Sequence, residues 1–180
     1  MFRPADRRYV MMRDHPLTEE FLHGFAQRWE SAWNSRDPEQ VLALLHPEIE
    51  WDDTVFWPEV IRGIPAMRPY LDAIFRAMPD VVFHDVQLFT APDAGRGIWL
   101  FRQEGSGPAR YGPGGRFSNH GCDIWLAFRD GLLSSYLSRY DMAEIMRQFH
   151  ALPPRGDLLG GTYLRRLAEG PPTVGARASF

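Results

Sequence analysis

The 180-residue sequence contains a single cysteine, Cys122, so no disulfide can form within the chain, and this fits a reducing compartment. It has no hydrophobic run of membrane-spanning length. The apolar stretch Tyr9–Met12 near the N-terminus is far too short to be the core of a signal peptide. We therefore expect a protein of the cytoplasm with no membrane partner.

The net charge, the histidine spacing and the lack of nucleophile motifs argue against three further classes of protein. The formal net charge is −3, which is not the basic footprint of a nucleic-acid-binding protein, so no nucleic-acid partner is expected. The six histidines form no H-x-H or H-E-x-x-H spacing, and we expect no metal site. No serine stands in a G-x-S-x-G elbow, and Cys122 has no activating motif around it, which disfavours a covalent nucleophile.

Aromatic residues are abundant by contrast, at 13% of the chain with six Trp and twelve Phe. Such side chains either pack a core or line a cavity for a flat, apolar ligand, and the sequence leaves both open. Eight residues, all but one of them aromatic, are the candidate contacts of a small hydrophobic ligand: Trp29, Trp33, Trp51, Phe56, His84, Trp99, Trp125 and Tyr136.

The expected elements change from helices to strands along the chain. Capping residues and apolar spacing predict helices that begin at Thr18, Asp37 and Asp141, and one within residues 65–78. His46-Pro47 is expected to end the second of them. Residues 81–90, 97–104, 117–129 and 132–140 are predicted as strands.

This order predicts an α+β fold, in which helices pack across one face of a curved, mostly antiparallel sheet. We expect one domain over residues 17–152. An arm (residues 1–16) precedes it, and a partly mobile extension (residues 153–180) follows it.

One acidic residue interrupts an alternating strand pattern. From 49 to 55 the even positions are polar, whereas the odd positions carry Ile49, Trp51, Asp53 and Val55. A strand with this alternation turns Asp53 toward the interior. A buried carboxylate needs partners, or it holds its proton more tightly than in water, and this is the usual setting of a general acid or base. Asp53 is therefore the first candidate catalytic residue.

Asp123 is the only charge in the apolar stretch 121–128. It is either an acid near a strand end, solvated or paired with Arg116 or Arg102, or a second pocket carboxylate that apolar walls keep protonated. His120 is either a hydrogen-bonded structural side chain or a pocket acid/base. Asp53, Asp123 and His120 make up the candidate catalytic set. Asp141 is interpreted as a helix cap.

Three segments and the end of the strand region resemble a known family. The pattern W-x-x-x-W-N-x-x-D covers Trp29–Asp37, and Leu44–Asp53 and Ile61–Gly63 follow it. Together with residues 130–148, these segments resemble the SnoaL-like branch of the nuclear transport factor 2-like superfamily. The resemblance extends over roughly residues 18–152.

The resemblance implies a cone-shaped α+β barrel whose sheet wraps around a pocket, commonly as a homodimer and generally without a cofactor. Relatives include ketosteroid isomerase, polyketide cyclases, limonene-epoxide hydrolase, scytalone dehydratase and binding-only proteins. Asp53 matches the proton-shuttling Asp of ketosteroid isomerase, and Asp123 falls near its protonated oxyanion-hole Asp. The chain departs from the isomerase at Trp29, where that enzyme has a Tyr, and from the cyclases at Ser138, where they have an Asp.

Two functions remain open at this point. In the first, a cofactor-free enzyme of isomerase, cyclase, dehydratase or epoxide hydrolase type acts on a polyketide-, steroid- or terpenoid-like molecule. Asp53 removes a proton or activates water, and Asp123, with His120 or Tyr136, stabilises the oxyanion. In the second, a module of the same fold binds a small molecule or dimerises without catalysis.

Overall fold

The computed structural model of the chain describes residues 17–107, 115–149 and 151. The predicted arm (residues 1–16) and the predicted extension (residues 153–180) both lie outside the described residues. Within the described part, no helix combines the length and apolarity that a membrane crossing requires.

Helices α1 (Glu19–Ser35) and α2 (Pro38–Leu42) form where the capping residues predict them. Helix α3 (Ile64–Ala77) forms in the predicted segment 65–78, with Gly63 at its start and no side-chain cap. Thr18 caps α1 by accepting a hydrogen bond from the Phe21 N–H at 3.1 Å. Asp37 caps α2 in the same way. Pro69 lies inside α3 rather than at its first turn. A fourth helix, α4 (Met142–Gln148), begins after Asp141, whose side chain accepts from the Glu144 N–H as a cap should.

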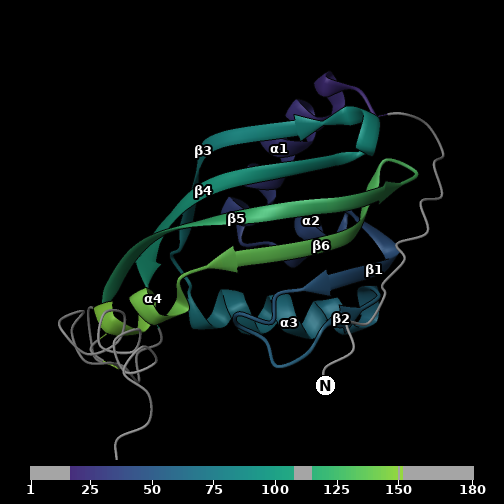
Figure 1. Cartoon of the computed structure of the whole chain (residues 1–180). Helices are drawn as coiled ribbons and strands as arrows, with labels where there is room; N and C mark the ends of the chain where they lie inside the picture. The colour runs from purple at the N-terminus through teal and green to yellow at the C-terminus, as the bar shows by residue number, and fades with distance from the viewer. Residues whose placement is uncertain (1–16, 108–114, 150, 152–180) are drawn as a thin grey trace, which may run out of the picture.

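Six strands form one sheet in the order β2-β1-β6-β5-β4-β3. Every neighbouring pair is antiparallel except β1 and β6, which are parallel. The sheet is curved and unclosed, with β2 and β3 at its edges (Figure 1). Its strands are β1 (Leu45–Asp52), β2 (Ile61–Arg62), β3 (Val82–Ala91), β4 (Arg96–Ser106), β5 (Arg116–Arg129) and β6 (Leu132–Tyr140).

The prediction that His46-Pro47 ends the second helix is wrong. Helix α2 already ends at Leu42, and both residues belong to β1. A proline is tolerated there because the β1–β6 register shifts between Leu45 and Glu50, and β2 pairs with β1 only at Glu50 and Trp51. The missing N–H of Pro47 therefore interrupts no regular ladder.

Helices α1 and α3 cover one face of the sheet, and α4 lies at the end where β6 stops (Figure 1). The covered, inner face holds the main core, which is unusually aromatic. Its largest fully buried side chains are Trp29, Trp51, Trp99, Trp125 and Tyr70. This packing confirms the predicted α+β fold with helices across one sheet face.

Candidate functional site

Two neighbouring strands, β5 and β6, place side chains in register on the inner face of the sheet. Asp123 of β5 lies opposite Ser138 of β6, and Trp125 lies opposite Tyr136 in the same way. Gly121 lies opposite Tyr140. Since side chains two apart share a face of a strand, one inner surface carries Asp123 together with both tyrosines of β6.

Asp123 is buried, with 4% of its surface exposed, and accepts hydrogen bonds from three side chains. Its Oδ2 accepts from the Trp29 indole N–H at 2.8 Å. Its Oδ1 accepts from the Tyr136 hydroxyl and, at 3.1 Å, from the Ser138 hydroxyl. Burial raises the pKa of Asp123 to about 7, although the bonds from Tyr136, Trp29 and Ser138 favour the ionised form.

Asp53 follows directly after β1 and is equally buried, with 4% of its surface exposed. Its Oδ2 accepts from the Tyr70 hydroxyl of α3 at 2.5 Å. The Tyr140 hydroxyl donates from the other side, 3.0 Å from Oδ1 and 3.3 Å from Oδ2. Burial raises the pKa of Asp53 to about 6, and the bonds from Tyr70 and Tyr140 oppose that rise.

The negative charge of Asp53 adds a smaller contribution to the raised pKa of Asp123. No arginine forms an ion pair with either carboxylate among the described residues. Burial also raises the pKa of Tyr140, so its hydroxyl remains a hydrogen-bond donor. The arrangement therefore holds a carboxylate of near-neutral pKa beside a phenol, as proton transfer requires.

Several of the candidate ligand contacts surround this pair. Trp29 binds Asp123, and Trp51 stacks on Tyr136 with ring centroids 3.6 Å apart. Phe56 lies exposed on the loop that follows Asp53.

Three further candidate tryptophans, Trp33, Trp99 and Trp125, are buried in the core. Trp99 donates its indole N–H to Asp85, and Trp125 packs edge-on against Phe25. Trp33 lines a separate apolar cavity of about 10 Å³ between α1, α3 and β3, which has room for about one water molecule. None of the three donates a hydrogen bond to Asp53 or Asp123 in the described part of the chain.

The structure does not bring the two candidate histidines to the carboxylates. His120 is exposed and lies opposite Arg102 on the outer face of the sheet. His84 also lies opposite Arg102, and it pairs with Glu104 at 3.2 Å. Both are therefore separated from Asp53 and Asp123 by the sheet.

Sequence reasoning missed two residues of the cluster, Tyr70 and Tyr140, and did not foresee the contact of Ser138 with Asp123. Tyr140 carried a signal, because it continues the alternation of Tyr136 and Ser138 on the strand that was correctly predicted. Tyr70 carried none, because its spacing from Met67, Leu71 and Ile74 is that of an ordinary buried helix face.

Comparisons with known proteins agree with this architecture. A family model described as a SnoaL-like domain matches residues 26–136. No curated protein sequence matches the chain.

Many solved structures are similar. TsrD from Streptomyces laurentii is 25% identical with a TM-score of 0.62, covering 76% of this chain and 99% of its own. A polyketide cyclase candidate from Xanthomonas campestris pv. campestris is 17% identical with a TM-score of 0.64, over 72% of this chain and 97% of its own. The epoxide hydrolase/cyclase-like enzyme SalBIII, which has a role in pyran ring formation in the polyether salinomycin, is 16% identical with a TM-score of 0.60. The match covers 70% of this chain and 95% of SalBIII.

Proposed function

The chain belongs to the SnoaL-like domain family, and from this premise we propose that it is an enzyme that uses Asp53 as a general base on a small, largely apolar molecule. The observation that carries the proposal is the buried Asp53 carboxylate held between the hydroxyls of Tyr70 and Tyr140. A base with a pKa of about 6 is ionised at neutral pH and still binds a transferred proton well.

The tyrosines supply the complementary acid. A proton taken from a substrate carbon leaves negative charge on a neighbouring oxygen, and a donor aimed at that oxygen stabilises it. Tyr140 is the donor best suited to this step because its hydroxyl is only partly buried and contacts both oxygens of Asp53. Its bond can pass from the carboxylate to the substrate as the carboxylate takes up the proton.

Asp123 has a different role in this proposal. All three hydrogen bonds to its oxygens are buried, whereas the bond from Tyr140 to Asp53 is only partly buried, so Asp123 is less open to a substrate atom than Asp53. It instead fixes Tyr136, on which Trp51 stacks, and so holds the wall of the site next to Asp53. Isomerisation, dehydration, cyclisation and epoxide opening all use a base and a donor in this way.

The test is turnover of three substrate classes by the wild type and Asp53→Asn: β,γ-unsaturated ketosteroids, phenolic polyketides and terpene epoxides. Loss of a general base is expected to lower kcat by about 10²–10⁴-fold. Asp52→Asn is the matched control, because this adjacent carboxylate bonds instead to Thr54 on the solvent side, and it should retain most activity. Equal turnover by Asp53→Asn and wild type would remove Asp53 from the mechanism.

The alternative is a non-catalytic module that binds a small molecule in the same place. In that case Tyr70 and Tyr140 keep their hydrogen bonds to Asp53 when a ligand is bound. Compounds from the panel then bind without being converted. Calorimetric binding with no turnover in the wild type would favour this alternative.

A further inference from the structure

Neither carboxylate of the proposed site is accessible in the closed structure. Asp53 and Asp123 expose 4% of their surfaces each, and the Tyr140 hydroxyl covers both oxygens of Asp53. A small molecule can reach Asp53 only if part of the structure moves. The main core resists such movement because α1, α3 and the sheet interlock through close-packed aromatic rings, such as Trp51 on Tyr136.

Helix α4 packs on a different, smaller cluster. Ile145 of α4 and Phe149, the residue after α4, pack with Val81 and Phe117. Only the partly buried Met78 and Phe83 pack against both this cluster and the main core among the described residues. Tyr140 also packs against this cluster, and Asp141, the cap of α4, is the next residue. One residue therefore joins the second cluster to the Asp53 carboxylate.

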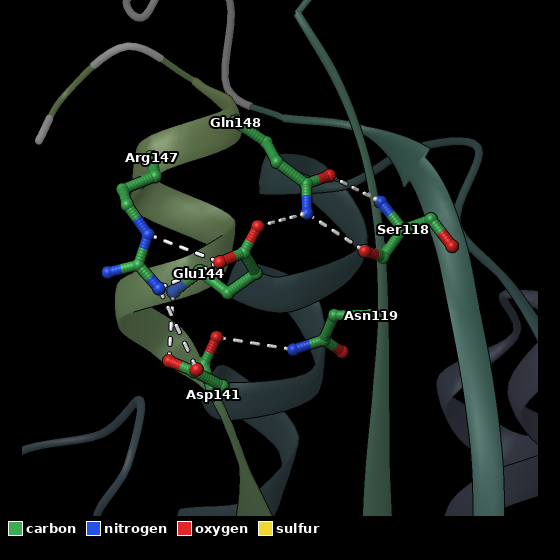
Figure 2. Close-up of polar contacts among 6 residues, drawn as sticks. All are labelled: Ser118, Asn119, Asp141, Glu144, Arg147 and Gln148. Atoms are coloured by element: carbon green, nitrogen blue, oxygen red, sulfur yellow. Dashed lines mark hydrogen bonds and ion pairs between the residues drawn. The ribbon is translucent and has the colours of Figure 1, made fainter. Parts of the chain in front are cut away.

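A side-chain amide fastens α4 to the sheet (Figure 2). Strand β6 last pairs with β5 at Tyr140 opposite Gly121, so the backbone of Ser118 lies beyond the end of its neighbour. The side-chain amide of Gln148 pairs with the Ser118 backbone there, as a neighbouring strand would. Its Oε1 accepts from the Ser118 N–H at 2.8 Å, and its Nε2 donates to the Ser118 carbonyl at 2.9 Å.

Other polar contacts hold α4 together as a unit. Arg147 donates to Glu144 at 2.7 Å and lies 3.8 Å from Asp141, all within the helix and its cap (Figure 2). The Asn119 amide of β5 also donates to the Asp141 carbonyl at 3.2 Å. That contact lies at the junction with β6, whereas the Gln148 contact lies at the far end of the helix.

We propose that α4 is the gate of the Asp53 site, that it turns about the Tyr140–Asp141 junction, and that the Gln148–Ser118 amide pair is its latch. When Gln148 leaves Ser118, α4 swings from the sheet and draws the Tyr140 hydroxyl away from Asp53. The carboxylate is then open to an incoming molecule. The proposal rests on the proposed function for the identity of the reacting group, but its test requires no turnover.

The test compares Gln148→Ala with the wild type by two measurements. Amide hydrogen exchange reports the opening of α4, and carbodiimide coupling to glycinamide, followed by mass spectrometry, reports the accessibility of Asp53. Since the sequence has no lysine, no lysine side chain competes for the activated carboxylate. Loss of the two backbone hydrogen bonds should raise both α4 exchange and Asp53 labelling by roughly ten-fold.

Two controls separate the gate from general loosening. Gln40→Ala removes the same amide from the exposed surface of α2 and should change neither measurement. The exposed Asp93 should be labelled equally in all variants, and α1 should keep its exchange rates.

A second variant opens the gate from the sheet side. A Cβ at Gly107 would lie 2.2–2.6 Å from ring atoms of Phe149, so Gly107→Ala displaces that ring and leaves Gln148 intact. It should likewise increase Asp53 labelling.

Three outcomes would overturn the proposal. Faster α4 exchange with unchanged Asp53 labelling makes α4 an end cap rather than a gate. Faster exchange in α1 as well as α4 indicates unfolding. No change in either measurement shows that Gln148 is not the latch. Failure of the proposed function is a separate result, because it appears as turnover that does not depend on Asp53.

Discussion

The hydroxyl of Tyr140 donates to both carboxylate oxygens of Asp53, across 87 residues of sequence. Tyr70, on α3, contacts Oδ2 of the same carboxylate. Asp53 is thereby held between the helical layer and the last strand of the sheet. A change that moves either tyrosine should alter the titration of Asp53 as well as its position.

Stability is expected to fall as the pH rises from about 4.5 to about 7.5, because folding raises the pKa of two carboxyl groups. Asp53 and Asp123 titrate near 6 and 7 in the folded chain, against an ordinary value of 3.8. The folded state therefore binds more protons across this window, and the free energy of unfolding loses up to about 1.4 kcal/mol per pH unit for each group. Urea unfolding at several pH values measures the slope.

Asp123→Asn should flatten the upper part of that slope because the variant side chain does not titrate. Asp93→Asn, which changes an exposed carboxylate, should leave the slope unchanged. A stability that instead rises through this window would contradict the raised pKa values.

The three donors to Asp123 should differ in their influence on its titration. Each favours the ionised carboxylate, and Tyr136 does so most strongly, followed by Trp29 and Ser138. Tyr136→Phe should therefore raise the pKa of Asp123 further above 7, and Ser138→Ala should raise it less. Infrared or NMR titration of the carboxyl group measures both values. A larger effect of Ser138→Ala would show that the Tyr136 bond is not the principal one.

Two glycine-to-alanine substitutions should have opposite effects on stability. A Cβ at Gly121 would lie 2.5 Å from the Phe101 ring and 2.9 Å from the Cβ of Tyr140, so Gly121→Ala should cost about 1–3 kcal/mol and displace Tyr140. In the middle of α1, Gly24 has only the flexible end of Arg28 near the added methyl group, at 3.6 Å. Gly24→Ala should therefore stabilise the chain by about 0.5–1 kcal/mol. Thermal unfolding distinguishes the two.

The homodimer implied by the family resemblance stays a prediction. The outer face of the sheet carries exposed apolar side chains that could form its interface. Phe89, Ile98, Ile124 and Leu137 lie opposite one another in a row across four strands. Phe89 is 49% exposed and Ile98 is 39% exposed. If a second copy covers this row, Ile98→Arg should convert a dimer to a monomer in sedimentation experiments, whereas Gln40→Arg on α2 should not. A wild type that sediments as a monomer would contradict the prediction.

Alternation along a single strand was sufficient to find the two carboxylates. Ile49, Trp51 and Asp53 are all buried, as their spacing predicts, and Asp123 shares its strand face with Trp125. The same rule places His120 on the opposite face, because it stands three positions, an odd number, before Asp123. Parity alone therefore explains its absence from the cluster.

His84 alternates with Val82, Val86 and Leu88 in the sequence, which predicts that it shares their apolar strand face, and here alternation fails. The register of β3 shifts between Asp85 and Gln87, so His84 lies opposite Arg102 on the outer face, whereas Leu88 lies opposite Trp99 on the inner face. A bulge of this kind leaves no clear mark in a single sequence. The contact of Tyr70 with Asp53 was equally hidden, because it depends on how α3 packs against the end of β1.

The parallel pairing of β1 with β6 also has a consequence for how the chain acquires its site during synthesis. The last strand, β6, is the neighbour of the first, β1. Asp53 therefore cannot form its hydrogen bond with Tyr140 until almost the whole domain has left the ribosome. Contacts of such long sequence separation form late in folding. A nascent or truncated chain that ends before residue 132 lacks β6, and it leaves Trp51 and its neighbours on β1 open to chaperones.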